Sequence, residues 1–366
     1  MQELKVTANE AGQRLDKLLT KYLNQAGKGF LYKMMRKKNI TLNGKKCEGA
    51  ERLEEGDVIR LFLADETIAK FSQITADLSF APSASKVPQA LKTPQTLNGR
   101  PLSESSTVCC KKTGKENSAQ AVKLDIIYED SHILIVNKPS GMLSQKAKES
   151  DISLNEHILN YLIQSGHLPV EQLRTFKPSI CNRLDRNTSG LILAGKTVAA
   201  TQQLSELIAE RAVGKYYLTV VKGTVTETER IRGYLTKNER TNRVSIQREQ
   251  QGDAVYIETA YRPLCAGRGC TLLEVELVTG KSHQIRSHLA SIGHPLAGDT
   301  KYGDAEFNRR FREKYGLKYQ LLHSWKAVFP ELTGTLSDLS GKTFTAPLPS
   351  SVRRILQGEH LTGEGL

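Results

Sequence analysis

Residues 181–190 read Cys-Asn-Arg-Leu-Asp-Arg-Asn-Thr-Ser-Gly, and the apolar run Leu-Ile-Leu-Ala follows at 191–194. Polar, turn-forming residues before an apolar run are typical of a loop that leads into a buried strand. Asp185 lies in this loop between Arg183 and Arg186. A carboxylate beside fixed cations stays ionised and can serve as a nucleophile or a base. A turn rich in structural salt bridges explains the same residues, so the pattern alone leaves both interpretations open.

The segments around this loop predict a mixed sheet. Apolar runs indicate strands at 133–139, 191–194, 215–221 and 272–278, and helical patterns fall at 198–212 and 282–292. Strands and helices do not alternate strictly, which favours an α+β domain with a largely antiparallel sheet over a doubly wound parallel sheet. We assign residues 123–350 to this domain and expect a C-terminal tail at 351–366.

A second polar segment, residues 279–289, reads Thr-Gly-Lys-Ser-His-Gln-Ile-Arg-Ser-His-Leu. The glycine turn opens a predicted helix that carries Arg286, and such a helix start offers free backbone N–H groups to an anion. An ordinary surface helix explains the segment equally well. His283, His288 and His294 do not fall on one helical face, so we expect hydrogen-bonding groups and no metal site.

The N-terminal segment, residues 1–70, predicts a small separate domain. Helical spacing relates Leu15, Leu18, Leu19, Tyr22 and Leu23. A second helix is expected at 30–38, then strands at 40–42 and 56–62 with an Asn-Gly turn at 43–44. The stretch from Lys21 to Lys46 holds eight Lys or Arg residues and no Asp or Glu. A run of one charge repels itself, so RNA contact is favoured over a merely solvated face, with these candidate residues: Lys33, Arg36, Lys37 and Lys38.

The composition agrees with a polyanion-binding protein. The formal charge is +13 and the sequence pI is near 9.4, which attracts nucleic acid at long range. No run approaches the roughly 18 apolar residues of a membrane span, and we expect a cytoplasmic protein. The six cysteines form no Cys-x-x-Cys pair and are interpreted as reduced thiols. Residues 71–122 are rich in Ser, Thr, Pro and Lys and predict a flexible linker or insertion.

Three motifs together resemble one known family. Residues 183–191 resemble the catalytic loop of RluA-type pseudouridine synthases, and residues 215–223 are similar to their tyrosine strand. Residues 281–289, followed by 293–299 and Tyr302-Gly303, resemble their arginine motif. The family often has His where this chain has Asn182. Near the N-terminus, Arg14-Leu15-Asp16, the basic helix and residues 42–44 resemble the S-four RNA-binding domain that precedes this catalytic domain in many members.

The resemblance implies an isomerase that needs no cofactor and converts uridine in RNA to pseudouridine. Asp185 would be the catalytic carboxylate, and either attack on the anomeric carbon or removal of the 2′ proton stays open. Arg286 would hold Asp185, and Tyr217 would stack on the uracil ring. Arg183 would fill the gap left by the flipped nucleotide.

The resemblance also favours large-subunit ribosomal RNA over transfer RNA as the substrate, and we expect a monomer without an obligate protein partner. Two rival hypotheses remain. The first is an RNA-binding protein without catalysis, against which the joint presence of Asp185, Tyr217 and Arg286 argues. The second is a metal-dependent hydrolase built on His283, His288 and Asp299.

Overall fold

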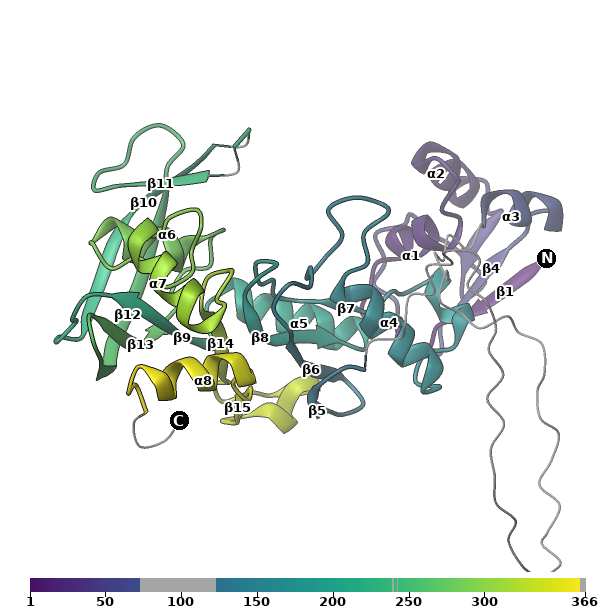
Figure 1. Ribbon diagram of the computed structural model, residues 1–366. Coiled ribbons are helices and arrows are strands. Elements are labelled where there is room, and N and C mark those ends of the chain that lie inside the picture. The colour runs from purple at the N-terminus through teal and green to yellow at the C-terminus, as the bar shows by residue number, and fades with distance from the viewer. Residues whose placement is uncertain (73–122, 239, 242, 363–366) are drawn as a thin grey trace, which may run out of the picture. The chain divides into compact units, whose positions relative to one another are not determined.

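The computed structural model describes residues 1–72, 123–238, 240–241 and 243–362 (Figure 1). The predicted linker, with Cys109 and Cys110, lies almost entirely outside the described residues. Within the described part, no helix has the length and apolar character needed to cross a membrane.

The N-terminal residues form a small sheet covered by helices. The sheet order is β1-β4-β2-β3, and all its pairs are antiparallel. The strands are β1 Gln2–Lys5, β2 Ile40–Leu42, β3 Lys45–Lys46 and β4 Val58–Leu61. The helices are α1 Leu15–Tyr22, α2 Lys28–Arg36 and α3 Asp65–Phe71. The expected helical spacing is confirmed, because the apolar residues of α1 are all buried in one core.

The basic helix α2 begins and ends two residues earlier than the sequence predicted. Leu31, Met34 and Met35 face the core, whereas the four candidate RNA-binding cations, at positions 33 and 36–38, are exposed. Asn43 and Gly44 join β2 to β3 with left-handed backbone angles (φ 51° and 74°), as a two-residue hairpin turn requires. The amphipathic pattern therefore places the cations on the surface.

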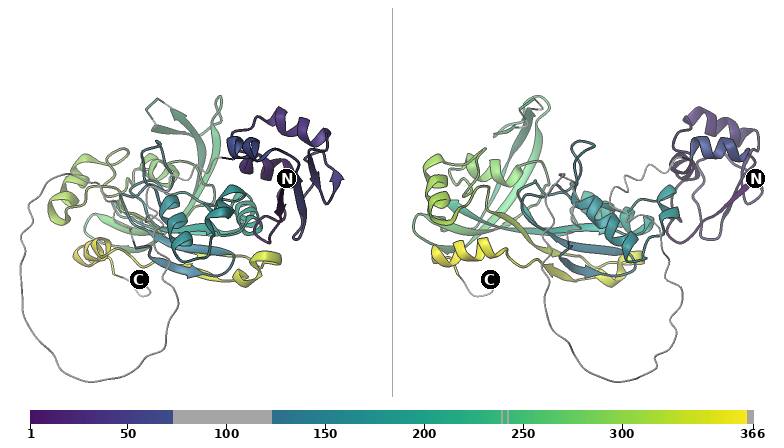
Figure 2. Two further views of the ribbon diagram at one scale, coloured as in Figure 1. Left: turned by 90° about the vertical axis from the view of Figure 1, so that its right-hand side faces the viewer. Right: turned by 45° about the vertical axis from the view of Figure 1, so that its right-hand side comes forward.

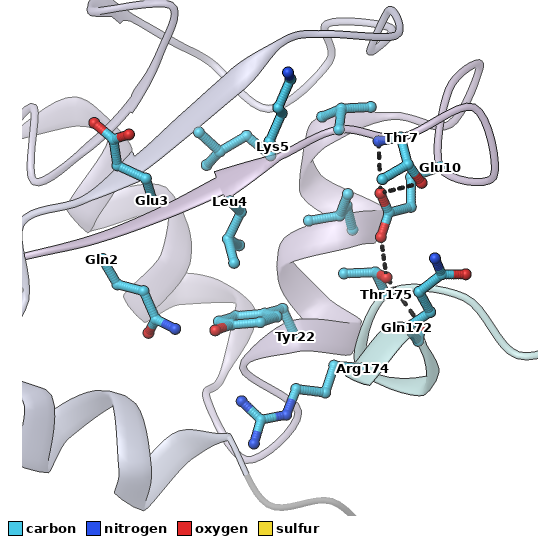
Figure 3. Close-up of a pocket in the computed structure, with 13 residues that line it drawn as sticks. Gln2, Glu3, Leu4, Lys5, Thr7, Glu10, Tyr22, Gln172, Arg174 and Thr175 are labelled. Carbon is cyan, nitrogen blue, oxygen red and sulfur yellow. Dashed lines mark hydrogen bonds between the residues drawn. The ribbon is translucent and has the colours of Figure 1, made fainter. Parts of the chain in front are cut away.

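A buried carboxylate stabilises the turn that follows β1. Glu10 accepts hydrogen bonds from the backbone N–H of Thr7 (2.8 Å) and from its hydroxyl (3.0 Å), as Figure 3 shows. The hydroxyl of Thr175 donates to the other carboxylate oxygen. Burial of this charge without such donors would be costly, so these hydrogen bonds keep Glu10 compatible with its position.

The second sheet contains eleven strands within the described residues, and nine of them follow the order β11-β10-β12-β13-β9-β14-β8-β6-β5. β7 pairs with β8, and β15 pairs with β14. The strands are β5 Ile126–Glu129, β6 Ile133–Lys138, β7 Ser179–Ile180, β8 Ser189–Gly195, β9 Gly214–Lys222, β10 Glu229–Asn238, β11 Arg243–Gln247, β12 Val255–Ala266, β13 Cys270–Glu276, β14 Leu322–Val328 and β15 Thr343–Thr345. Of the pairs described, β14 with β8 is parallel and the others are antiparallel. The expected α+β class with a largely antiparallel sheet is confirmed.

Helices cover the large sheet at several places. They are α4 Leu154–Gln164, α5 Val198–Ala209, α6 Gln284–Ser291, α7 Ala305–Tyr315 and α8 Ser350–Gly358, with short 3₁₀ turns η1 Val170–Arg174 and η2 Gly334–Leu339. The hairpin of β10 and β11 projects beyond the helices (Figure 2). Helix α5 ends three residues earlier than predicted because Arg211 adopts a left-handed conformation (φ 63°).

The central strands are covered on both faces, which explains their continuous apolar sequence. Along β6, Leu134 and Val136 belong to one hydrophobic cluster, whereas Ile133 and Ile135 belong to another. Successive side chains of a strand point to opposite faces, so the two clusters lie on the two sides of the sheet. Helix α4 contributes to the first cluster and α5 to the second.

The prediction of a tail after residue 350 is wrong for residues 351–361. Val352, Ile355 and Leu356 of α8 pack with Phe311 of α7 in one cluster, and Leu361 is fully buried. Spacings of three and four residues give α8 the apolar face that this contact needs. The domain assigned to residues 123–350 therefore extends past residue 350.

Candidate active site

Side chains hold the first half of the loop between β7 and β8. The amide of Asn182 donates to the carbonyl of Leu191 (3.2 Å) and accepts from the N–H of Leu193 (2.7 Å). The hydroxyl of Ser144 accepts from the N–H of Leu184 (3.0 Å) and donates to its carbonyl (2.8 Å). These bonds give the loop a defined path, so the next residue, the candidate acid, has a fixed position.

A buried lysine connects this loop to the end of β6. Lys138 is fully buried, and its ammonium donates to the carbonyls of Pro139 (2.9 Å), Met142 (2.8 Å) and Arg186 (3.1 Å). Burial lowers the pKa of Lys138 to about 8, and the negative charge of Asp185 acts in the opposite direction. The sequence analysis did not single out Lys138. The one feature that could have drawn attention to it is its place between an apolar strand and a proline.

Arg286 links the candidate acid to a second carboxylate. Its Nη1 donates to Oδ2 of Asp185 at 2.9 Å, while Nε and Nη2 donate to Oδ2 and Oδ1 of Asp299 at 2.7 and 2.9 Å. The side chain of Asp299 is 0% exposed, and that of Asp185 is 28% exposed. Oδ1 of Asp185 has no hydrogen-bond donor among the described residues. Asp299 therefore orients the guanidinium, and Asp185 keeps one oxygen available.

The charges in this network reinforce one another. Burial acts to lower the pKa of Arg286, but the carboxylates of Asp299 and Asp185 outweigh it and raise that pKa above its ordinary value. Burial likewise acts to raise the pKa of Asp299, but the hydrogen bonds and charge of Arg286 bring it below the usual value. The buried pair is thus charged at neutral pH.

The start of α6 presents Arg286 to the loop. Gln284 accepts from the hydroxyl of Thr279 (2.9 Å) and donates to the carbonyl of Glu258 (3.0 Å), which fixes the first turn. The helix begins at Gln284, two residues later than predicted, because His283 has a left-handed backbone (φ 56°).

The histidines near this helix are hydrogen-bonding groups, as the sequence predicted. Each places Nδ1 at 3.0 Å from a different oxygen: His283 with Tyr302, His288 with Thr259 and His294 with the carbonyl of Lys222. The ring of Tyr302 also lies 5.3 Å from the guanidinium of Arg286, and its hydroxyl accepts from the N–H of Val244 (3.0 Å). Tyr302 thereby connects β11 to the site.

Three of the candidate residues line a cleft of about 760 Å³, whereas Arg286 is not part of its lining. Asp185, Tyr217 and exposed Arg183 all border it. Its other cationic lining residues are Lys146, Lys215, Lys237 and Lys281. Among its described lining residues Asp185 is the one acid, so the cleft suits an anionic substrate whose reacting centre meets a carboxylate. The cations at 33 and 36–38 are not part of this lining.

Tyr217 lies on β9 and is 4% exposed. Burial raises its pKa to about 12, a hydrogen bond to Ser324 opposes this, and the charge of Asp185 adds to it. The phenol is therefore protonated at neutral pH. Tyr217 lines the same cleft as Asp185, so the structure brings these two candidate residues together.

Asp185 borders a basic cleft and is paired with Arg286 behind it, an arrangement that suits an enzyme acting on a polyanion. Residues 132–291 match the model of the RNA pseudouridylate synthase family, and this range contains Asp185, Tyr217 and Arg286. This part of the chain is thus similar to the RNA pseudouridylate synthases, which are isomerases that act on RNA.

Two relatives and a solved structure are also similar to this chain. The ribosomal large subunit pseudouridine synthase C of Escherichia coli K12 is 28% identical over 365 residues, covering 96% of this chain and 94% of the relative. The protein of the same name from Haemophilus influenzae is 29% identical over 367 residues, covering 97% and 94%. The human RNA pseudouridylate synthase domain containing 4 has a similar fold, with a TM-score of 0.52 and 19% identity over 64% of this chain and 93% of that chain.

Proposed function

We propose that this chain isomerises specific uridines of large-subunit ribosomal RNA to pseudouridine, with Asp185 as the catalytic carboxylate. The observation that carries the role of Asp185 is its 2.9 Å contact with Arg286, made while Asp185 itself lines the basic cleft. The ribosomal substrate is supported by the names of relatives that match nearly the whole chain.

The reaction breaks the bond between the ribose C1′ and N1 of uracil and forms a bond from C1′ to C5. A proton leaves C5, and N1 gains one, so the product is an isomer. Asp185 either attacks C1′ or removes the 2′ proton, and both routes need an ionised carboxylate with a free oxygen. Arg286 donates a charge-assisted hydrogen bond to Oδ2, which leaves Oδ1 to face the substrate.

Tyr217 and Arg183 would contact the substrate. The aromatic ring of Tyr217 would stack on uracil, and its protonated hydroxyl could return a proton late in the reaction. Arg183 is exposed at the cleft, which suits a side chain that enters the space of a flipped nucleotide.

The N-terminal residues 1–70 would act as an S-four-like RNA-binding domain through Lys33, Arg36, Lys37 and Lys38. All four are exposed, as a surface that contacts phosphate requires. We further propose that the enzyme works as a cytoplasmic monomer. Sedimentation of the purified protein, alone and at high concentration, tests the oligomeric state.

The test of the catalytic assignment is tritium release from a large-subunit ribosomal RNA transcript labelled at C5 of uracil. Wild type should release tritium, and Asp185→Ala should not, while RNA binding stays nearly unchanged. Asp338→Ala is the matched control, because Asp338 is exposed and does not line the cleft. Release by Asp185→Ala would refute the role of Asp185. RNA binding without release by wild type would favour the non-catalytic alternative.

A further inference from the structure

Lys215 is a cation in the cleft to which no role has been assigned. It lies on β9, is half-buried and borders the same cleft as Asp185. Among the residues that the structure describes, no carboxylate or hydrogen-bond acceptor pairs with its ammonium. The charge that acts on it is that of another cation, Arg211.

Other buried lysines of this domain have partners. Lys138 donates to three carbonyl oxygens. Lys196 contacts the carboxylate of Glu129 at 2.8 Å and the carbonyl of Asp130 at 2.6 Å. Burial lowers the pKa of Lys215 first, and the charge of Arg211 lowers it further. A partly desolvated cation without a counter-ion is costly to the folded protein, and such groups are frequent at ligand sites.

The position of Lys215 relative to the reacting centre is set by β9. Lys215 and Tyr217 are two residues apart on this strand, so their side chains point to the same face of the sheet and start about 6.6 Å apart along it. Tyr217 is close enough to Asp185 to respond to its charge. On the other side, a Cβ added at Gly280 would lie 3.9 Å from Nζ of Lys215. The ammonium therefore lies one step along the strand from the tyrosine, beside the backbone that precedes α6.

We propose that Nζ of Lys215 binds a non-bridging oxygen of the RNA phosphate that flanks the target uridine. This inference rests on the proposed function. A phosphate supplies the negative charge that Lys215 lacks in the free protein, whereas a uracil carbonyl supplies an acceptor without charge. Each ribose in RNA is flanked by phosphates, so a substrate whose ribose reaches Asp185 brings one into the same cleft. Lys215 is thus a positioning residue that fixes the nucleotide before the chemistry.

The experiment measures tritium release from the labelled large-subunit ribosomal RNA transcript at a series of salt concentrations. Lys215→Met should raise KM about tenfold or more with little change in kcat, since hydrogen bonds between charged partners are worth about 1.5–3 kcal/mol. The slope of log(kcat/KM) against log salt should flatten by about 0.7, the change expected for one phosphate contact on a single strand. Lys215→Arg should restore most of the affinity and slope.

Two controls separate this role from a structural one. Lys318→Met removes the same charge from an exposed position outside the cleft, so it should leave KM and the slope nearly unchanged. The melting temperature of Lys215→Met should equal or exceed that of wild type, because the substitution removes an uncompensated charge.

Three results would overturn the proposal while leaving the reaction itself established. The first is a kinetic profile of Lys215→Met that equals that of Lys318→Met. The second is a raised KM with an unchanged salt slope, which would indicate a neutral partner such as a uracil carbonyl. The third is a lower melting temperature with a lower kcat and the wild-type slope, which would indicate a structural lysine. Failure of wild type to release tritium would instead refute the proposed function.

Discussion

Asp299→Asn tests the inference that a buried carboxylate orients the arginine of the site. Asp299 accepts two bonds from Arg286 and is hydrogen-bonded by the N–H groups of Lys301 (2.8 Å) and Tyr302 (3.1 Å). Asparagine has the same shape, but it loses the charge and replaces one acceptor by an NH₂ group that faces donors. The guanidinium would lose its orientation and part of its charge compensation.

The expected cost follows from the burial of both partners. Removing one member of a buried ion pair destabilises a protein by about 3–5 kcal/mol. The lower end applies here, because Arg286 retains Asp185 at 2.9 Å. A loss of about 3 kcal/mol corresponds to a fall of about 6–12 °C in melting temperature for a domain of this size. Asp185→Asn should cost less, because its side chain is 28% exposed and makes a single bond to Arg286.

Calorimetry and tritium release measure the two consequences separately. Asp299→Asn should show both a lower melting temperature and a lower kcat, by roughly tenfold or more at a temperature where it is folded. Asp185→Asn should abolish activity with a smaller change in melting temperature, and Asp338→Asn should change neither. A melting temperature for Asp299→Asn within about 2 °C of wild type would refute the reasoning, since even 1 kcal/mol shifts it by roughly that much.

Three further predictions concern other parts of the chain. The pKa of Lys138 is lowered from 10.5 to about 8 in the folded protein, so the unfolded state binds more protons between these two pH values. Wild type should therefore gain stability relative to Lys138→Met as pH rises from 8 to 10.5, by up to about 3 kcal/mol. Denaturant titrations measure this difference, and a difference that does not change with pH would contradict the prediction. Gly190→Ala should abolish folding or activity, because Gly190 has φ 112° and an added Cβ would lie 2.0 Å from the carbonyl oxygen of Ser324. The control Gly29→Ala, on α2 with open space around it, should be tolerated. A stable and active Gly190→Ala enzyme would show that β8 and β14 can separate. The last prediction concerns four exposed cations of the N-terminal domain: Lys33, Arg36, Lys37 and Lys38. Neutralising them should flatten the salt dependence of RNA binding by about 0.7–0.9 per phosphate contact. An unchanged slope would show that RNA binds to another surface.

Local sequence patterns were enough to predict a helix or strand wherever its formation depends on residues close to one another in the chain. The spacing of Leu15, Leu18 and Leu19 predicted α1 because a helix brings such residues to one face. The apolar run of β8 predicted a buried strand, and the structure covers it on both sides. Asp185 and Arg286 stood out as charged residues in a loop and at a helix start, but these patterns also allowed a structural interpretation, and their proposed roles came from the resemblance to a known family.

Helix ends and the last helix show where this information stops. Arg211 and His283 adopt left-handed conformations that end α5 and delay α6, although neither residue type requires such a conformation. The stripe on α8 was visible, but its partner, Phe311, comes from α7. Sequence periodicity identifies the apolar face of a helix or strand, but it does not identify the residues that pack against that face.

The sequence by itself determined most of the elements and the class of fold, and it singled out the charged residues that we propose act on RNA. Only the tertiary structure decided how these charges are paired: Arg286 meets Asp185 from 101 residues away and Asp299 from 13 residues away. It also decided that Lys138 is buried with three acceptors and that Lys215 has none among the described residues. The reason is that the energy of a charge depends on its solvation and its neighbours in space, and neither is encoded in a short stretch of chain.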